Sequence, residues 1–154
     1  MNIFVLSNDF EECSKWHLDK HIVKMPLETA QLLCTALHIN GFKNTPYKPT
    51  HLKHPCTIWT AHSKQNFIWL CSLGKFLCAE YSYRYGKIHK CQEVISICEK
   101  NHSMIPDHTL TDFAQAMPEI YKKQNAVEAY REYYRNDKKH IANWSKRDIP
   151  YWFA

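Results

Sequence analysis

Apolar residues recur along much of the chain at the three- and four-residue spacing of an amphipathic α-helix. A short apolar run at residues 2–6 precedes these segments and is expected to be a strand or a buried extended arm. The polar residues 7–9 can cap a helix that we expect to run from about Asp9 to Met25. Pro26 has no amide hydrogen, so it should kink or restart the helix, and a second helix should end at Asn40–Gly41.

The rest of the chain predicts further helices separated by loops. Residues 42–54 contain two prolines and are predicted to form a loop, whereas Pro55 can occupy the first turn of a long helix that Gly86 ends. Another helix follows, and Asn125 begins the capping-box pattern of a last helix that reaches about Trp144. The pattern therefore predicts a mainly α fold, a compact single-domain helical bundle that spans all 154 residues and has a short N-terminal extended arm.

Composition supports the same class. Hydrophobic residues make up 45% of the chain and charged residues 23%, which is typical of a globular rather than a disordered protein. With only three glycines and no regular series of short strands, an all-β sandwich or barrel is disfavoured. Uninterrupted apolar stretches are at most five residues long, so we expect no membrane partner.

The cysteines indicate the redox environment. There are seven, an odd number, and no two form a C-x-x-C pair. Cys71 and Cys78 are seven residues apart, as are Cys91 and Cys98, so each pair lies two turns apart on one helix face, where reduced cysteine behaves as a small hydrophobic residue. The first residues lack the basic and long apolar segments of a signal peptide. We expect buried thiols and a location in the cytoplasm of the host cell, without secretion.

Positive charge is concentrated in the middle of the chain. The formal net charge is +5, whereas residues 43–100 alone carry +6, from nine Lys and Arg against three acids. Such a surplus suits a polyanion such as nucleic acid. The alternative is an ordinary solubilising surface charge.

Candidate chemistry is densest at residues 17–28. Four titratable side chains of this segment are His17, His21, Lys24 and Glu28. They are spaced i, i+4, i+7 and i+11, so on one helix they share a face. Histidine exchanges protons near neutral pH, and an amine and a carboxylate lie close to both rings. We interpret the four as candidate catalytic residues and Lys20 as a candidate nucleic-acid contact; the alternative is a solvated face of paired charges.

A zinc site is a second interpretation of the same histidines. Cys13, His17 and His21 are spaced i, i+4 and i+8, and residues 51–56 contain two histidines and a cysteine. The chain has neither an H-E-x-x-H nor a C-x-x-C motif, so we expect no metal and no other cofactor. A metal-dependent nucleotide-modifying or hydrolytic enzyme that uses His17, His21 and Glu28 stays an alternative.

Two segments interleave cations with aromatic rings, at residues 47–55 and 83–90. The first leads into a predicted helix N-terminus, where free amides bind phosphate. Aromatic faces that stack on bases and cations that neutralise phosphates suit single-stranded or flipped nucleotides. The alternative is that the tyrosines are packed and the lysines only solvated. The candidate nucleic-acid contacts of these segments are Lys48, His51, Lys53, His54, Arg84, Tyr85, Lys87 and Lys90.

Several motifs support a family resemblance. They are His17-x-Asp-Lys-His-x-x-Lys-Met-x-x-Glu28, Tyr-Lys-Pro-Thr-His51, His54-Pro-Cys56, Tyr-Arg-Tyr-Gly-Lys87 and Gln-Ala-Met-Pro118. Over nearly its whole length the chain resembles a group of short, largely uncharacterised phage and giant-virus proteins. More distantly it resembles the phage pyrimidine-dimer DNA glycosylase (endonuclease V) family, a small all-α fold. The shared layout is a short N-terminal arm, a helix with an early His-Leu pair and a nearby Pro, a His before a long helix, and an aromatic tail.

The second resemblance implies a reaction. In that family an amine attacks the sugar C1′ of a damaged nucleotide, forms an imine and allows strand cleavage, and a carboxylate assists. The amine is the N-terminus that removal of Met exposes. Here Asn2 is too large for efficient Met removal, so the nucleophile would be the amine of Met1 or of Lys24, with Glu28 as the acid. An amine must be unprotonated to attack. The reference pKa of an α-amine, ~7.7–8.0, is nearer to neutral pH than that of a lysine, ~10.4, so it needs a smaller shift.

We therefore expect a viral DNA repair or DNA-processing enzyme of the glycosylase/AP-lyase type. Its partner would be duplex DNA from which a damaged, pyrimidine-dimer-like or modified base is drawn out. Besides the metal-dependent enzyme, a non-catalytic nucleic-acid-binding protein is an alternative, in which the same residues contact phosphate.

Overall fold

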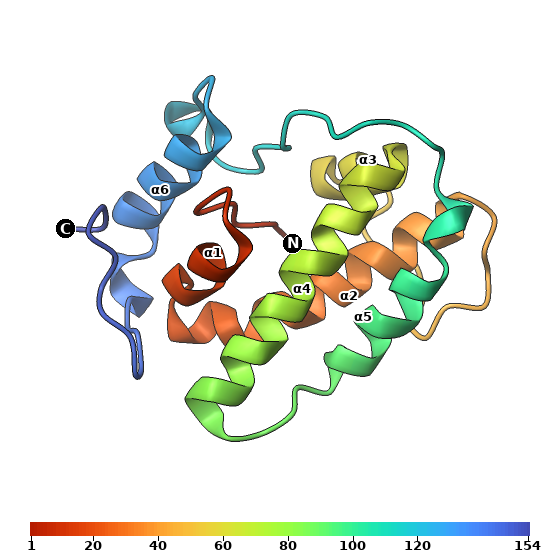
Figure 1. Cartoon of the computed structure of the whole chain (residues 1–154). Coiled ribbons are helices and arrows are strands. Elements are labelled where there is room, and N and C mark those ends of the chain that lie inside the picture. The colour runs from red at the N-terminus through yellow and green to blue at the C-terminus, as the bar shows by residue number, and fades with distance from the viewer.

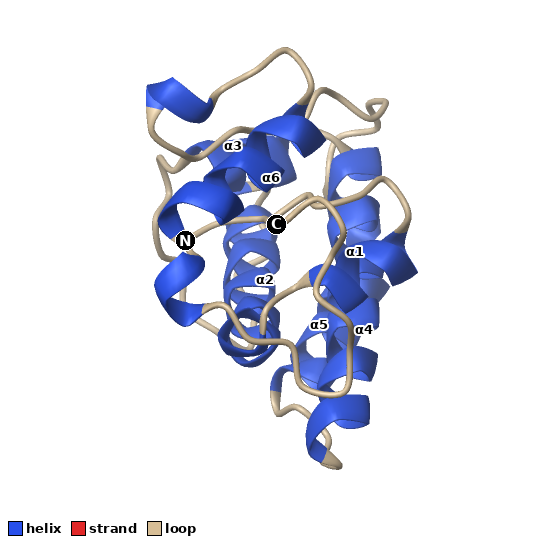
Figure 2. Ribbon diagram, turned by 90° about the vertical axis from the view of Figure 1, so that its left-hand side faces the viewer, coloured by secondary structure: helices blue, strands red, loops and turns tan.

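The computed structural model describes all residues from 1 to 154, and they form helices but no strand (Figures 1 and 2). Single turns of 3₁₀ helix lie at His102–Met104, Glu119–Tyr121 and Lys139–Ile141. The predicted mainly α class is confirmed. No helix combines the length and the apolar character needed to cross a membrane. The α-helices are α1 (Phe10–Trp16), α2 (Asp19–Ile39), α3 (Pro55–His62), α4 (Lys64–Tyr85), α5 (Cys91–Lys100) and α6 (Ala126–Asp137).

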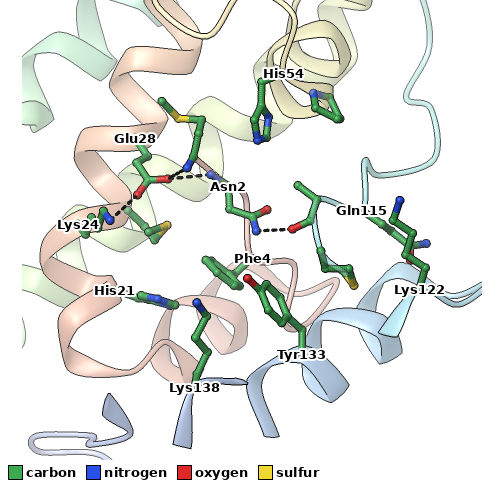
Figure 3. A pocket seen from close by; sticks show the side chains of 15 residues that line it. Asn2, Phe4, His21, Lys24, Glu28, His54, Gln115, Lys122, Tyr133 and Lys138 are labelled. Atoms are coloured by element: carbon green, nitrogen blue, oxygen red, sulfur yellow. Dashed lines mark hydrogen bonds and ion pairs between the residues drawn. The ribbon is translucent and has the colours of Figure 1, made fainter. Parts of the chain in front are cut away.

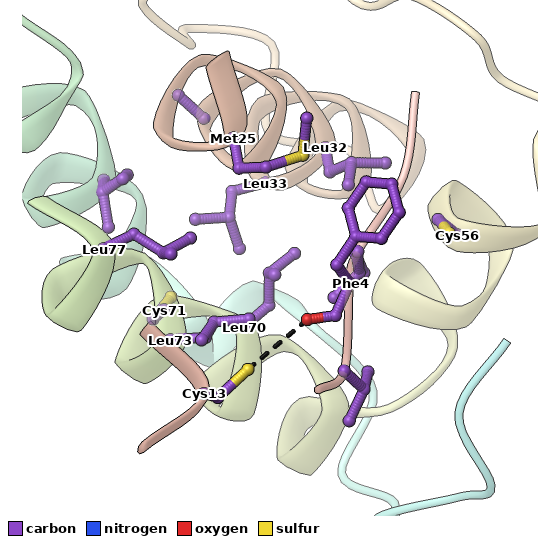
Figure 4. Close-up of a cluster of buried hydrophobic side chains, with 14 of the residues drawn as sticks. Phe4, Cys13, Met25, Leu32, Leu33, Cys56, Leu70, Cys71, Leu73 and Leu77 are labelled. Carbon is purple, nitrogen blue, oxygen red and sulfur yellow. Dashed lines mark hydrogen bonds between the residues drawn. The ribbon is translucent and has the colours of Figure 1, made fainter. Parts of the chain in front are cut away.

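Helix α2 is central in the packing, because α3, α4 and α5 all contact it (Figure 1). Leucines of α2 and α4 fill the space between these two helices (Figure 4). All seven cysteines are free and buried, as the sequence predicted. The Cys13 thiol, for example, donates to the Phe4 carbonyl at 3.4 Å. The labelled leucines of this cluster are Leu32 and Leu33 of α2 and Leu70, Leu73 and Leu77 of α4.

The apolar run at residues 2–6 is a buried extended arm and not a strand. Leu6 has no exposed surface, and its carbonyl accepts a hydrogen bond from the Arg131 side chain of α6 at 2.9 Å. The Asn2 side chain donates to the Ala116 carbonyl at 2.8 Å and accepts from the Tyr130 hydroxyl at 2.9 Å. These contacts fix the beginning of the chain in the interior, between α2 and the segment that leads to α6.

The first predicted helix is in fact two helices. Helix α1 ends at Trp16 and α2 begins at Asp19, because the intervening residues His17 and Leu18 are extended. The Asp19 amide donates to the Asn143 carbonyl at 2.8 Å, which replaces a backbone bond that the break removes. A contact from the far end of the chain therefore stabilises the break, and His17 is not on the same helix as the other three candidate catalytic residues.

Helix α2 continues through Pro26, where the sequence predicted a kink or a restart. Proline in a helix costs one hydrogen bond and crowds the preceding turn. Packing of α2 against three other helices outweighs this local cost. Because the helix continues, His21, Lys24 and Glu28 stay on one face of it. The predicted end is confirmed: α2 stops at Ile39, and Gly41 follows with φ +95°.

The long helix predicted from Pro55 to Gly86 is interrupted at Ser63. The Ser63 hydroxyl accepts from the Asn66 amide at 3.3 Å and donates to the loop at residues 108–109, so it caps α4 and ties down a crossing segment. Pro55 in the first turn and Gly86 at the end, with φ +66°, are confirmed.

Asn125 caps α6, as predicted, by accepting from the Glu128 amide at 3.1 Å. The helix ends at Asp137 and does not reach Trp144. The remaining residues fold back, and the Trp144 indole donates to the Trp16 carbonyl at 2.8 Å. The C-terminal segment thus packs against the break between α1 and α2.

Candidate functional site

A pocket of about 450 Å³ opens where the N-terminal arm meets α2, the start of α3 and the segments around α6 (Figure 3). Its α2 wall consists of residues three and four positions apart, which share one helix face. The pocket therefore joins segments that are far apart in sequence. The lining residues are Met1, Asn2, Phe4, His21, Lys24, Met25, Glu28, His54, Pro55, Gln115, Ala116, Met117, Lys122, Tyr133 and Lys138.

An amine and a carboxylate meet in the pocket. The α-amine of Met1 lies 3.4 Å from Glu28 Oε1, and the same oxygen accepts the Asn2 amide at 2.7 Å (Figure 3). Glu28 is only 5% exposed, so both interactions are shielded from water. The arm thus holds an amino group against a buried carboxylate, in a geometry that the backbone itself fixes.

Cations surround this pair. Lys24 Nζ lies 3.8 Å from Glu28 Oε2, and its side chain is 67% exposed, which leaves it free to reach a ligand. Lys122 and Lys138 line the pocket from the α6 side. Lys138 Nζ lies 4.9 Å from the centre of the Tyr133 ring. Glu28 is the only carboxylate in the lining, so the pocket is electropositive and suits an anionic ligand.

Aromatic rings form the inner wall. Phe4 stacks on the His21 ring with centroids 4.4 Å apart and on Tyr133 with centroids 5.9 Å apart. His21 Nδ1 lies 2.7 Å from the hydroxyl of Tyr134, which is fully buried. Burial, followed by the nearby His17, Lys138 and Lys24, lowers the pKa of His21 to about 2. His21 is therefore neutral at physiological pH and does not exchange protons there, contrary to the acid/base role predicted for it.

His54 forms the wall next to Met1. Its Nδ1 accepts the Cys56 amide at 3.0 Å, which caps α3 and fixes the ring. Burial lowers the pKa of His54, and the N-terminal charge and His51 add to this effect. The ring thus contributes a polar edge to the pocket without adding a full charge.

The structure brings three of the four candidate catalytic residues together, and His17 is the exception. His17 is 0% exposed and does not line the pocket. Its Nδ1 donates to the Cys13 carbonyl at 2.7 Å, while Nε2 has no partner. Burial lowers the pKa of His17 to about 4. The prediction of a catalytic His17 is wrong, because the break before α2 turns this ring into the core.

Most candidate nucleic-acid contacts lie on the surface. His54 lines the pocket, and the exposed loop at residues 48–53 leads directly to it. His89 Nε2 donates to the Val23 carbonyl at 2.8 Å and attaches the second basic segment to α2, at a residue that does not line the pocket. The exposed candidates are Lys20, Lys48, His51, Lys53, Tyr85, Lys87 and Lys90.

The prediction that Arg84 contacts nucleic acid is wrong. Its side chain is 0% exposed and cannot reach a nucleic acid. The guanidinium donates to Glu80 at 2.7 Å and to Asp19 at 3.0 Å, and it also contacts the carbonyls of residues 15 and 17. Arg147 donates to Glu80 from the other side at 2.9 Å. Arg84 is therefore a buried structural residue that joins α4 to the start of α2.

The alternative of a metal-dependent enzyme finds no ligand set. No group of three or more His, Cys, Asp or Glu side chains is arranged to hold a metal ion. Burial raises the pKa of Cys13 to about 11 and that of Cys56 to about 12, which opposes the thiolate that a metal would need. His54 Nδ1 is already engaged by the Cys56 amide. These donors serve the protein's own hydrogen bonds.

Sequence reasoning missed part of the lining, namely Asn2, Phe4, residues 115–117, Lys122, Tyr133 and Lys138. Two signals could have found some of it. Asn2 is a polar residue that opens an apolar run, and the Gln-Ala-Met-Pro118 motif had no assigned role. Tyr133 and Lys138 carry no such signal, because only the docking of α6 brings them to the pocket.

The site is thus an electropositive, partly aromatic pocket with one amine–carboxylate pair at its base. Comparison with protein-family models, with curated proteins and with solved structures gives no match for this chain. The function of the pocket therefore rests on the chemistry of its own residues.

Proposed function

We propose that the protein is a DNA glycosylase/AP-lyase that excises a damaged, pyrimidine-dimer-like or modified base through an imine between an amine of the pocket and the deoxyribose. One observation carries this proposal: an α-amine held 3.4 Å from a buried carboxylate inside an electropositive pocket. The proposal concerns the chain with Met1 as its first residue, as it stands in this structure.

Two amines are candidates for the nucleophile, and the geometry favours that of Met1. The Met1 amine lies inside the pocket beside Glu28, whereas the Lys24 side chain is mostly in water. A carboxylate next to an amine can orient it and accept the proton that it loses before attack. Lys24 is the second candidate, because its Nζ reaches the other oxygen of the same carboxylate.

The pocket also suits an extruded nucleotide. Its volume of about 450 Å³ lies within the ~300–1,000 Å³ of small-molecule sites. The partly exposed Tyr133 ring, backed by the buried Phe4, offers aromatic surface to a base. Lys138 can neutralise a flanking phosphate, and so can Lys122 in exchange for its ion pair with Glu119. A base inside a duplex cannot reach the Met1 amine, so flipping is part of the proposal.

The proposed reaction has four steps. The amine nitrogen bonds to C1′ and loses a proton, and the bond from C1′ to the base breaks, so that the base leaves with the electron pair and takes up a proton. The C1′–O4′ bond of the sugar ring then breaks, O4′ takes up a proton, and C1′ and the amine nitrogen form an iminium. The iminium loses a C2′ proton, and the C3′–O bond breaks with departure of the 3′ phosphate. Water then adds to the imine carbon and releases the amine. Glu28 is placed to take the proton in the first step.

Borohydride trapping tests this proposal. Borohydride reduces an enzyme–sugar imine to a stable amine, so the protein incubated with duplex DNA containing one abasic site should give a covalent adduct. Ultraviolet-irradiated duplex should give the same adduct if pyrimidine dimers are substrates. Peptide mass spectrometry should place the link at the Met1 amine. An adduct at Lys24 would instead assign the nucleophile to that side chain.

Matched variants separate the two amines. Extension of the chain by two residues before Met1 should abolish trapping through the α-amine, whereas Lys24→Gln should leave it in place. Glu28→Gln should reduce the trapping rate by at least tenfold, because the amine loses its charged partner. Lys100→Gln, an exposed lysine at the end of α5, is the control. If the protein binds damaged duplexes but forms no adduct with any of them, the proposed glycosylase/AP-lyase activity is wrong, and a non-catalytic DNA-binding protein is favoured.

A further inference from the structure

We infer that His21 is a fixed neutral hydrogen-bond donor that presents Nε2–H to an acceptor atom of the ligand in the pocket. The identity of the ligand rests on the proposed function, whereas the position of the proton follows from the protein alone. The acceptor would be an oxygen or an unprotonated nitrogen of the nucleotide, on either its sugar or its base. His21 would thus read the substrate without exchanging protons with it.

Counting protons around Tyr134 locates the proton on His21. The Tyr134 hydroxyl is fully buried and has two hydrogen-bond partners, the Leu18 amide at 3.4 Å and His21 Nδ1 at 2.7 Å. The amide can only donate, so it uses a lone pair of the hydroxyl oxygen. The single hydroxyl proton then has one acceptor within reach, which is His21 Nδ1. A proton on Nδ1 would leave the buried hydroxyl proton without any acceptor, at a cost of about 1–3 kcal/mol.

The remaining ring nitrogen faces the pocket. A neutral imidazole that accepts at Nδ1 carries its proton on Nε2. His21 Nε2 has no hydrogen-bond partner in the protein. Unlike Nε2 of His17, it is not fully enclosed and keeps some accessible surface. Because His21 is only 6% exposed and lines the pocket, the surface that Nε2 retains belongs to the pocket. The donor is therefore available to a ligand.

The surroundings keep the ring neutral and in place. The Phe4 ring stacks on one face of it at 4.4 Å. Lys24 and Lys138 are cations on the pocket side, so a positive charge on His21 would be repelled. The His17 ring, 6.5 Å away on the core side, is neutral and offers this charge no partner. Glu28 belongs to the same pocket but is engaged by the Met1 amine and the Asn2 amide. A rigid donor of this kind needs no reorganisation when a ligand binds.

Nuclear magnetic resonance of the free protein tests the position of the proton. Long-range ¹H–¹⁵N correlation of histidine-labelled protein distinguishes Nε2–H, Nδ1–H and doubly protonated rings. We expect the Nε2–H pattern for His21, unchanged between pH 8 and pH 5, and its loss in Tyr134→Phe. An Nδ1–H pattern, or protonation of the ring within this range, would overturn the inference. This measurement needs no substrate, so it is independent of the proposed activity.

Paired substitutions test the recognition of an acceptor. The amide nitrogen of Gln reaches the place of His Nε2, whereas that of Asn reaches the place of Nδ1. Binding is measured to two duplexes, one with a tetrahydrofuran abasic analogue and one with a pyrimidine dimer. We expect His21→Asn to weaken binding to at least one of them by about tenfold, the loss of one hydrogen bond, and His21→Gln to stay within about threefold on both. A loss confined to the dimer-containing duplex would place the acceptor on the base, and a loss on both duplexes would place it on the sugar.

Equal binding by His21→Asn, His21→Gln and the wild type would overturn the recognition role. If the wild-type protein binds neither duplex, the proposed function is wrong and DNA is not the ligand. The NMR spectrum of the His21 ring would then be the only test of whether Nε2 carries the proton. Circular dichroism of each variant confirms that the helices are retained.

Discussion

Two histidines four residues apart carry their protons on opposite ring nitrogens. His17 donates through Nδ1 to the Cys13 carbonyl, and its Nε2 is enclosed without a partner. His21 accepts at Nδ1 from Tyr134 and turns Nε2 to the pocket. The difference arises from the extended residues between α1 and α2, which point the two rings to different sides. One ring became part of the core and the other part of the site.

The burial of His17 predicts how stability depends on pH. Its pKa is about 4 in the folded protein, below the ordinary value of 6.5, so between these values the unfolded chain binds a proton that the folded chain does not. Acidification in this range therefore favours unfolding. Between pH 7 and pH 5 the free energy of unfolding should fall by about 2 kcal/mol through this residue, and further through His21, whose pKa is lowered in the same direction.

Urea denaturation at pH 7, 6 and 5 measures this dependence. His17→Asn, whose amide can donate to the Cys13 carbonyl, should flatten the pH dependence by about 2 kcal/mol over this range, even if its stability at pH 7 is lower. His140→Asn is the matched control, because the exposed His140 ring stays in water in both the folded and the unfolded state. A slope that is the same in wild type and His17→Asn would mean that the His17 ring is not held neutral in the core.

At the scale of helices, the sequence predicted the elements better than their interruptions. Pro55, Gly86 and Asn125 mark helix ends by local chemistry, and all three were placed correctly. The breaks at His17–Leu18 and at Ser63 depend on partners more than 40 residues away, namely Asn143 and the loop at residues 108–109. No local pattern encodes such contacts, so these breaks could not be predicted from the sequence.

The same distinction explains the site. His21, Lys24 and Glu28 were predicted together because their spacing on one helix is a local property that survives Pro26. Arg84 was assigned to nucleic acid because a tyrosine–arginine–tyrosine segment looks alike whether it faces solvent or the core. Arg84 is buried because it pairs with two carboxylates, Asp19 and Glu80. Asp19 lies far from it in sequence, so the segment alone does not reveal this pairing.

The buried ion-pair network predicts that Arg84 holds several elements together. Arg84 joins α4 to the start of α2, and Arg147 extends the network to the C-terminal segment. Arg84→Met keeps the length of the side chain but leaves Glu80 and Asp19 without their buried partner. Breaking such a pair typically costs about 3–5 kcal/mol, so the free energy of unfolding should fall by roughly that amount.

Chemical denaturation checks this loss, and Lys87→Met, on an exposed residue three positions later, should stay within about 0.5 kcal/mol of the wild type. Because Arg84 is buried, DNA affinity of the folded variant should not change. Unchanged stability with a loss of DNA affinity would restore Arg84 as a nucleic-acid contact.

At the scale of the whole molecule, the two exposed basic segments lie differently relative to the pocket. The loop at residues 48–53 leads into His54 on one wall. The segment at residues 87–90 is attached through His89 to the carbonyl of Val23, a residue of α2 that does not line the pocket. We therefore expect the first segment to hold DNA next to the pocket and the second to add a contact elsewhere on the surface.

This arrangement predicts a steep dependence of DNA binding on salt, because each neutralised phosphate releases counterions. Simultaneous substitution of Lys48, Lys53, Lys87 and Lys90 by Ala should flatten the slope of log K against log salt by up to about 3–4, at about 0.9 per phosphate contact, and leave the fold intact. The matched control replaces Lys15, Lys64 and Lys75, each of which is already paired with an acid, and should change the slope little. Fluorescence anisotropy of a labelled duplex between 50 and 200 mM salt measures both slopes. If the fourfold variant keeps the wild-type slope, the DNA does not follow these two segments.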